Sequence, residues 1–150
     1  MFKFKTDIKK SNISNYGLFA GENIPKGEIV SIFVDEDTTI THIDNIVPSE
    51  HFNRTSCRWV EDYFISSDEI TRDSYINHSF SPNMLYFFGV CFANKYIPKG
   101  EELTIDYSFL IHPKETFSLI DSKTKRKVDG LSNINYYVRS ILELGKLIDE

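Results

Sequence analysis

Apolar residues alternate with polar ones over several short stretches of the chain, in residues 2–4, 30–34 and 103–107. A period of two is typical of β-strands that bury one face. The stretch 85–92 is almost continuously apolar and rich in aromatic residues, which favours a strand in which Gly89 marks a bulge or a close backbone approach. The pattern therefore predicts a mainly β domain of short strands.

The spacing of apolar residues changes towards the end of the chain. From Ser132 onward they recur at intervals of three and four residues, at Ile134, Tyr137, Val138, Ile141, Leu142, Leu144, Leu147 and Ile148. This spacing predicts one amphipathic helix, with Ser132 or Asn133 as its N-cap. Between these regions, residues 57–65 favour a strand. Residues 35–55 are polar and irregular, with a helix-start signal at Pro48-Ser49-Glu50.

One ten-residue pattern occurs twice, in residues 19–28 and 92–101, and each copy ends in Ile-Pro-Lys-Gly-Glu. Proline at the second and glycine at the fourth position of such a window indicate a type I turn. Two copies are too few for a repeat architecture. We interpret them as one hairpin design that the fold uses twice.

Composition limits the class of protein. The 150 residues suffice for one domain with a substantial core, and 41% of them are hydrophobic. A net charge of −5 argues against a general nucleic-acid binder, which needs a basic surface. Two cysteines cannot form a disulfide framework or a four-thiolate zinc site. Without an apolar leader or membrane span in the sequence, we expect a soluble, intracellular protein.

The sequence lacks the motifs of several common enzyme classes. It has no Gly-x-Ser-x-Gly elbow, no P-loop and no Gly-x-Gly-x-x-Gly dinucleotide motif, and its four histidines are scattered. The basic run at residues 123–127 is interpreted as a solvated turn, with a targeting or nucleic-acid role as the alternative. Around Gly17 the chain is either an ordinary tight turn or a place that needs positive φ or a close backbone approach.

Two stretches concentrate polar chemistry. The first, from Asn77 to Asn83, places an amide, an imidazole and a hydroxyl side by side and then closes on Pro-Asn, as in a tight bend. The second, from Gly100 to Tyr107, is a turn followed by an alternating strand that ends on tyrosine. A lone histidine in a turn or a tyrosine at a strand end is usually structural. Their combination is what points to a function.

Taken together, these stretches resemble the paired signature of the SET-domain lysine methyltransferases. The family's Asn-His-Ser-x-x-Pro-Asn and Gly-Glu-Glu-Leu-Thr-x-Asp-Tyr motifs are matched in full, and its Gly-x-Gly loop and Lys-Gly-Glu turn correspond to residues 15–20 and 26–28. Asn15 stands where the family has the first glycine of that loop. The resemblance covers residues 11–110 and reaches none of the C-terminal forty residues.

The resemblance implies a mainly β fold with few helices, the β-clip-like SET fold of small curved sheets. In that fold the Asn-His-Ser segment passes beneath a knot-like C-terminal substructure. We expect a SET domain over residues 1–112 and a segment 113–150, with its amphipathic helix, that closes the same domain. The cysteine-rich zinc segments that flank many members are absent from the sequence. We therefore expect Tyr136 and Tyr137 of the helix, or Phe117, to close the cofactor pocket.

The family uses S-adenosyl-L-methionine and binds a protein lysine in an opposite cleft that meets the cofactor in a narrow channel. The site residues that the resemblance implies are Tyr107 for catalysis, Asn15, Tyr16, Gly17, Asn77 and His78 for the cofactor, and Tyr86 and Ile105 for the substrate channel. Tyr86, Phe87 and Phe88 are expected to supply aromatic lining. We expect no metal.

The expected reaction suits these residue types. Methyl transfer is an in-line displacement, so alignment of the two reactants supplies much of the acceleration. The attacking lysine must be neutral, which an aromatic, water-poor channel favours. Tyr107 suits an orienting role better than that of a base, because a tyrosine pKa near 10 is too high for a base at neutral pH. In the family that the sequence resembles, an extra hydroxyl in the channel restrains the product to monomethyl-lysine; Tyr86 would supply this hydroxyl and Ile105 would leave space, so the resemblance implies mono- or dimethylation.

The sequence therefore predicts a protein-lysine N-methyltransferase, intracellular, that acts on a histone tail or another protein lysine. Two alternatives stay open. One is a SET-like module that binds cofactor or a lysine peptide without turnover, and the other is an unrelated β-rich interaction protein. A homodimer is expected if so small a domain needs a partner to complete its clefts. No direct nucleic-acid or membrane partner is expected. The sequence does not decide whether the protein acts in the nucleus, in the cytoplasm or as a secreted effector.

Overall fold

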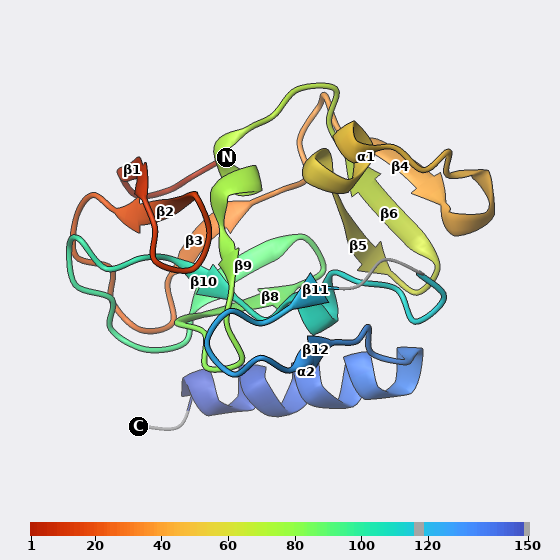
Figure 1. Cartoon of the computed structure of the whole chain (residues 1–150). Helices are drawn as coiled ribbons and strands as arrows, with labels where there is room; N and C mark the ends of the chain where they lie inside the picture. The colour runs from red at the N-terminus through yellow and green to blue at the C-terminus, as the bar shows by residue number, and fades with distance from the viewer. Residues whose placement is uncertain (116–118, 149–150) are drawn as a thin grey trace.

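The structure, a computed structural model, describes residues 1–115 and 119–148 and is built mainly of short strands (Figure 1). The strands are β1 (Thr6–Lys10), β2 (Tyr16–Ala20), β3 (Ile29–Ile32), β4 (Thr39–His42), β5 (Ser56–Val60), β6 (Tyr63–Ser66), β7 (Asn77–His78), β8 (Met84–Phe87), β9 (Val90–Ala93), β10 (Thr104–Ile105), β11 (Leu119–Ile120) and β12 (Lys127–Val128). The helices are α1 (Glu50–Thr55), α2 (Asn133–Ile148) and the 3-10 turns η1 (Ile43–Asn45), η2 (Arg72–Tyr75) and η3 (Tyr107–Phe109).

The strands form small separate sheets around one core. Two sheets have three strands, in the orders β3-β9-β8 and β4-β6-β5, and β1-β2 and β11-β12 are antiparallel pairs. The fifth pair, β7 with β10, is parallel and joins the Asn-His segment to the Thr-Ile segment of the tyrosine motif. The prediction of a mainly β domain closed by a C-terminal helix is confirmed.

The ten-residue repeat forms a pair of hairpins related by approximate two-fold symmetry. The backbone N–H of Ala20 donates to the carbonyl of Glu101 at 2.9 Å, and the equivalent N–H of Ala93 donates to Glu28 at 2.9 Å. Ile24 and Ile97, which are equivalent residues, exchange reciprocal bonds of 2.8 and 2.9 Å. The hairpin design is therefore used twice because the two copies pair with each other and close the core from both sides.

The prediction of one strand over residues 85–92 was wrong. The chain reverses within it: β8 and β9 pair as a tight antiparallel hairpin. Phe88 and Gly89 form its two-residue turn, and both have positive φ, 46° and 82°. Turns with positive φ at both central residues match the right-handed twist of the flanking strands. Gly89 is therefore part of the turn of this hairpin, and it does not form a bulge.

Residues 35–55 contain more regular structure than their composition predicts. The helix start at Ser49 is confirmed, because its hydroxyl caps α1 by accepting a hydrogen bond from the Phe52 N–H at 3.0 Å. The polar strand β4, by contrast, was missed. It pairs with β6 through backbone bonds, and its side chains are exposed or half-buried, so it has no continuous apolar signal.

The two motif stretches are joined by Asn83, a buried residue. Its side-chain amide donates to the Glu102 carbonyl at 2.8 Å and to Glu101 Oε1 at 2.9 Å, and its oxygen accepts from the Thr104 N–H at 2.9 Å. Buried polar groups that lose such partners are costly. The Asn at the end of the first motif is therefore a structural residue that fixes the position of the second.

Helix α2 begins at the cap that the sequence predicts. The Asn135 N–H donates to the Ser132 hydroxyl at 3.4 Å, which decides for Ser132 over Asn133. The Arg58 guanidinium, fully buried, donates to the Leu131 carbonyl at 2.5 Å and to the Asn133 side chain, and it lies 5.1 Å from the ring of Tyr136. Arg58 thus attaches the start of the helix to strand β5.

The face that α2 buries differs from the face that the spacing predicts. Tyr136 and Ser140 are its buried residues, and the Tyr136 ring stacks on Phe88 at a centroid distance of 5.6 Å. Most of the aliphatic residues that define the amphipathic pattern point away from the core. The existence of the helix was predicted correctly, but its aliphatic stripe does not form the core contact.

Candidate active site

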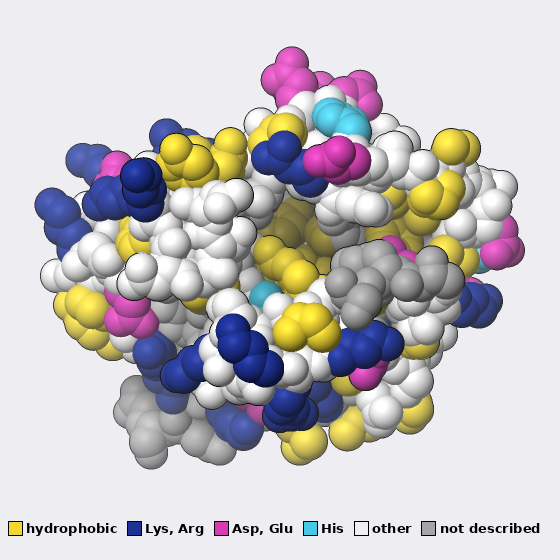
Figure 2. Space-filling model, viewed as in Figure 1, with side chains coloured by type: hydrophobic (Ala, Val, Ile, Leu, Met, Phe, Trp, Pro, Cys, Tyr) yellow, Lys and Arg dark blue, Asp and Glu magenta, His cyan; other side chains and the backbone are white. Residues whose placement is uncertain are grey.

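A cavity of about 570 Å³ opens between the small sheets. Figure 2 shows the hollow at the centre of the molecule, with hydrophobic side chains on its floor. Four of the predicted site residues line it: Asn77, His78, Ile105 and Tyr107. They come from the parallel pair β7-β10 and the turn η3 that follows, so the pairing of the two motifs brings them together.

Asn77 lies in a hydrogen-bonded cluster beside the cavity. Its amide nitrogen is 2.8 Å from Glu102 Oε1, 2.9 Å from the Tyr16 carbonyl and 3.3 Å from the Ser11 hydroxyl. The Ser11 hydroxyl donates to the same Glu102 carboxylate at 2.7 Å. The cluster connects the loop before β2 with both motif stretches. Glu102 was not among the predicted site residues, although it lies inside the tyrosine motif.

Gly17 is required by this cluster and has no positive φ, since the glycines with positive φ are Gly27, Gly89 and Gly100. A Cβ at residue 17 would lie 2.1 Å from Glu102 Oε1 and 3.0 Å from Asn77 Nδ2. Of the two interpretations of this glycine, the structure therefore supports the close approach.

The other loop residues lie at the surface. Asn15 and Tyr16 are exposed, and with residues 10–14 they border a shallow surface depression. Asn15 has no positive φ either, so its side chain causes no backbone strain where the family has glycine. Ile13 and Ser14 are the loop residues that line the 570 Å³ cavity. The role of Asn15, Tyr16 and Gly17 in cofactor binding stays a prediction.

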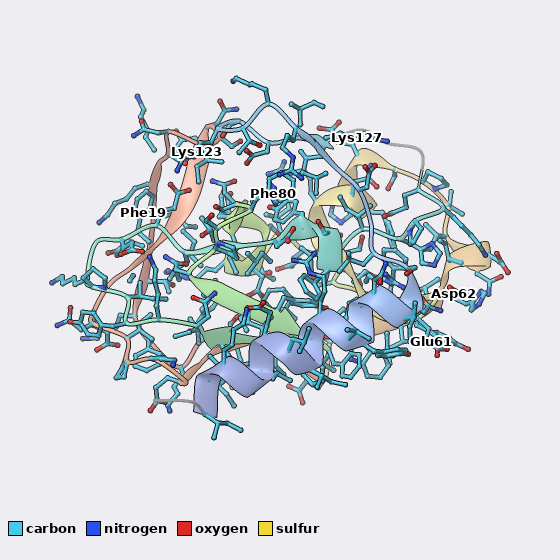
Figure 3. All side chains as sticks on the ribbon, turned by 90° about the horizontal axis from the view of Figure 1, so that it is seen from below. Phe19, Glu61, Asp62, Phe80, Lys123 and Lys127 are labelled. Carbon is cyan, nitrogen blue, oxygen red and sulfur yellow. The ribbon has the colours of Figure 1, made fainter. Side chains whose placement is uncertain are left out.

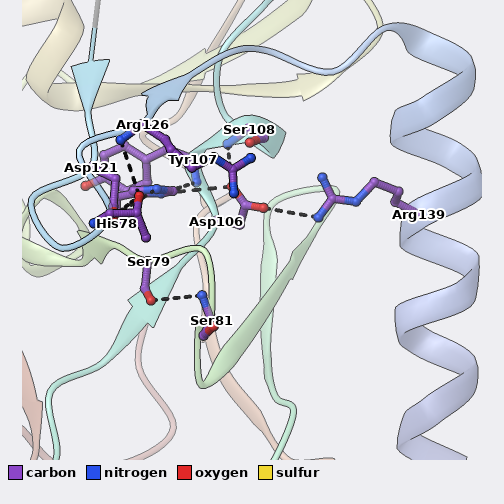
Figure 4. A network of polar contacts seen from close by, with 10 residues as sticks. His78, Ser79, Ser81, Asp106, Tyr107, Ser108, Asp121, Arg126 and Arg139 are labelled. Carbon is purple, nitrogen blue, oxygen red and sulfur yellow. Dashed lines mark hydrogen bonds and ion pairs between the residues drawn. The ribbon is translucent and has the colours of Figure 1, made fainter.

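His78 is buried and carries an unpartnered polar atom. Its Nδ1 accepts a hydrogen bond from the Tyr107 N–H at 3.0 Å, so the neutral ring carries its proton on Nε2. Nε2 has no hydrogen-bond partner and lies 3.7 Å from Asp121 Oδ1 (Figure 4). Burial lowers the His78 pKa below its ordinary value, and the Asp106 and Asp121 carboxylates oppose that shift only in part. A neutral donor therefore faces a buried carboxylate.

Tyr107 begins the turn η3, whose cap is the Asp106 carboxylate accepting from the Ser108 N–H at 2.9 Å. The strand therefore ends at Ile105 and does not reach the tyrosine. The Tyr107 hydroxyl donates to the Ile76 carbonyl. Burial raises the Tyr107 pKa well above its ordinary value. The phenol stays protonated at neutral pH and presents its oxygen lone pairs as acceptors.

Tyr86 does not line the cavity. It is fully buried on β8, where its hydroxyl donates to the Arg58 carbonyl at 2.6 Å and lies 3.4 Å from Cys57 Sγ. Phe87 and Phe88 do not line the cavity either, so this cavity lacks the aromatic lining that was expected from this strand, and the place of Tyr86 in a substrate channel stays a prediction. Among the described residues, the aromatic side chains that line it are Phe33, Phe64 and Tyr107. Strand β8 belongs to the core beneath them.

The hairpin β11-β12 closes one side of the cavity. Leu119, Ile120, Asp121 and Ser122 line it, whereas Tyr136 and Tyr137 of α2 do not. The closure of the cofactor pocket by one of these tyrosines stays a prediction. Phe117 lies outside the described residues. On the outer side of the hairpin, the Arg126 guanidinium lies 4.7 Å from the Phe80 ring, which contacts the His78 ring edge-on at 4.6 Å. These contacts hold the hairpin against the Asn-His-Ser bend.

The match to known proteins decides the family. A family model for the SET domain matches residues 15–108, which is more than half of the chain. The chain belongs to the SET-domain family. A Plasmodium falciparum variant-silencing SET domain-containing protein is 30% identical over 123 aligned residues, which cover 69% of this chain and 5% of that protein. The chain therefore spans a small part of this curated relative.

Solved SET-domain structures share the fold. A Plasmodium falciparum protein assigned as a histone methyltransferase gives a TM-score of 0.51 at 22% identity, over 71% of this chain and 95% of that one. The methyltransferase domain of human SETMAR gives 0.52 at 23%, over 71% and 45%. KRYPTONITE, solved with methylated DNA, a histone H3 peptide and the demethylated cofactor SAH, gives 0.57 at 16%, over 85% and 30%. The predicted SET fold is confirmed, while the knot-like crossing stays a prediction.

Two further SET-domain cavity residues were not predicted. Asp121 follows β11, in the part of the chain that resembles no family motif. Asp73 also lines the cavity, as does Asp35, and the Oδ1 atom of Asp73 is buried without a hydrogen-bond partner. Burial raises the Asp73 pKa to about 6. Neither residue carries a sequence signal, because single carboxylates in polar segments are usually solvated.

Within the described part of the chain, no three His, Cys, Asp or Glu side chains are grouped to hold a metal ion. Over the same residues, no helix combines the length and apolar character needed to cross a membrane.

Proposed function

We propose that this SET domain is an S-adenosyl-L-methionine-dependent protein-lysine N-methyltransferase. The observation that carries the proposal is the convergence of Asn77, His78, Ile105 and Tyr107 on one cavity of about 570 Å³. A volume of this size lies within the range of sites for small molecules and cofactors, roughly 300–1,000 Å³. The four residues come from the two motif stretches that the family signature comprises.

The residues present fit the cofactor. S-adenosyl-L-methionine carries an adenine with donor and acceptor edges, and the cavity offers the unpartnered Nε2–H donor of His78 beside the Asp121 carboxylate. We propose that His78 and Asp121 hold the adenine end and that Ser14 and Asn77 hold the amino-acid end. The cofactor would supply an electrophilic methyl group on a sulfonium.

The rest of the cavity suits a lysine side chain. Ile105, Phe33 and Phe64 give apolar walls, which favour the neutral amine that can attack a methyl group. Asp35 and Asp73 line the same cavity and would attract the ammonium form before it loses its proton. We propose a protein substrate with a basic segment around the target lysine. The histone H3 peptide bound in the KRYPTONITE structure makes a histone tail the first candidate.

Tyr107 is proposed to orient the lysine amine. Its hydroxyl proton is committed to the Ile76 carbonyl, so its lone pairs are free to accept a hydrogen bond from the amine. The raised pKa of the phenol excludes a role as general base at neutral pH. Fixing the amine in line with the methyl group would supply acceleration by positioning.

The experiment that tests this function is transfer of a labelled methyl group to histones by wild type and Tyr107→Phe. We expect Tyr107→Phe to keep cofactor affinity within a few-fold and to reduce turnover by roughly 100-fold, the scale on which a misplaced reacting group slows a reaction. Tyr96→Phe is the control, because Tyr96 is exposed and does not line the cavity. Cofactor binding without methyl transfer to any protein by wild type would instead indicate the non-catalytic module.

A further inference from the structure

Helix α2 presents an apolar face to solvent. Five aliphatic side chains, with exposed fractions between 46% and 82%, share this face: Ile134, Val138, Ile141, Leu142 and Ile148. Figure 3 shows the helix from its outer side, in front of the sheets. At 100° per residue these positions span about 120° of the helix surface, opposite the buried Tyr136 and Ser140. A surface helix normally turns such a stripe inward.

We propose that this stripe, defined by the five residues above, is the interface of a homodimer in which α2 pairs with α2 of a second copy in antiparallel orientation. The spacing is self-complementary. Ile134, Ile141 and Ile148 lie seven residues apart, so a two-fold axis at Ile141 places Ile134 of one copy against Ile148 of the other. Antiparallel helices also oppose their dipoles favourably.

The exposed area matches what a weak specific dimer needs. The five exposed fractions amount to about three fully exposed aliphatic side chains, or roughly 300 Å² of apolar surface per helix. A symmetric pair would therefore bury roughly 600 Å² of apolar surface. Since roughly 60% of such an interface is apolar and the polar rim supplies the rest, the total buried area would be about 1,000 Å². That total lies at the lower end of specific interfaces. An interface of this size is typical of a weak, transient dimer, which favours a second copy as the occupant.

Gly145 supports a close approach at this face. Among the residues that the structure describes, a Cβ added there would meet no atom within 4 Å, so no contact with them requires glycine. Glycine is also among the least favourable residues in a helix interior. With the axis at Ile141, Gly145 of one copy faces Tyr137 of the other, and the missing side chain leaves room for the aromatic ring.

Pairing through α2 would leave both active sites accessible. None of the five stripe residues lines the cavity, and the helix lies on a different side of the molecule from the hollow (Figures 1 and 2). The dimer therefore does not complete the cavity. It would double the number of substrate sites on one particle, which favours substrates with several target lysines.

The test measures molecular mass by sedimentation at protein concentrations from about 1 to 100 μM, the range that brackets a micromolar Kd. We expect a concentration-dependent dimer for wild type and a monomer for both Ile141→Lys and Ile141→Glu, since each variant places like charges together at the axis. An equimolar mixture of the two variants should dimerise again. Val47→Glu, at a strongly exposed residue outside the stripe, should leave the dimer unchanged.

Crosslinking distinguishes the orientation and the other occupants of the stripe. Facing residues at a helix crossing have Cα atoms close enough for a disulfide. The Ile141→Cys variant should therefore form a disulfide between the Cys side chains of its two copies. The native Cys57 and Cys91 are buried and will not compete. Ile134→Cys should crosslink to Ile148→Cys and not to itself. A wild type that stays monomeric at about 100 μM, or binds lipid vesicles through the stripe instead, would overturn the proposal.

Discussion

A single methyl group at residue 17 should disrupt the hydrogen-bonded cluster that fixes the loop before β2. In Gly17→Ala the new Cβ would lie 2.1 Å from Glu102 Oε1 and 2.8 Å from its Cδ, so the Glu102 side chain must withdraw. It would then lose its hydrogen bonds from Ser11 and Asn77. Bonds to a charged group contribute roughly 1.5–3 kcal/mol each, and Glu102 is half-exposed, so we expect a loss of roughly 2–4 kcal/mol.

A double-mutant cycle isolates this cause. Glu102→Ala removes the clashing carboxylate and the same two bonds, so Gly17→Ala should add little further destabilisation in that background. The expected coupling is roughly 2–3 kcal/mol, measured by urea unfolding of the four proteins. Glu101→Ala is the matched control, because that carboxylate bonds Asn83 and not the loop. Additive losses in the cycle would refute the close-approach explanation of Gly17.

Three further predictions follow from buried polar groups. Asn83→Ala should lower the free energy of unfolding by roughly 2–4 kcal/mol, because the Thr104 N–H and the Glu102 carbonyl lose their partner; an unchanged urea midpoint would contradict this. Asp73 has a pKa raised from 3.8 to about 6, so the folded state opposes its ionisation, and Asp73→Asn should stabilise the protein by about 1–3 kcal/mol at pH 7.5 and not at pH 4. In the Asp73→Asn background, thermal stability should fall as the pH drops below 6.5, because burial lowers the pKa of His78 and of His112 and the unfolded state protonates both more readily than the folded state does; a flat profile would refute the lowered pKa of these two histidines.

The sequence was sufficient to predict the fold class and the two motif stretches. Asn77 to Asn83 and Gly100 to Tyr107 are informative because their side chains bond to each other's backbone, so the residue types are constrained in both. The C-terminal helix was predicted from its spacing and its cap at Ser132. These features depend on local sequence or on contacts between the two motifs.

The rest depends on contacts that spacing does not encode. Asp121 reaches His78 only because the hairpin β11-β12 folds back over the Asn-His-Ser bend. Tyr136 determines which face of α2 packs against the core, and its hydroxyl donates to the Trp59 carbonyl at 3.2 Å. The aliphatic residues that dominate the helical pattern of the sequence do not determine this face. The residue type of Tyr86 suits a substrate channel, but strand β8 places this side chain in the core, where its hydroxyl donates to the Arg58 carbonyl.

The proposed function depends on the binding of S-adenosyl-L-methionine in the cavity around Asn77, His78 and Tyr107. Calorimetric titration of the folded protein with the cofactor and with its demethylated product tests it most directly. We expect saturable binding in the micromolar range for wild type and clearly weaker binding for Asn77→Ala, which loses the contacts to Glu102 and to the Tyr16 carbonyl. No heat of binding by folded wild type, or equal affinity in Asn77→Ala, would contradict the account.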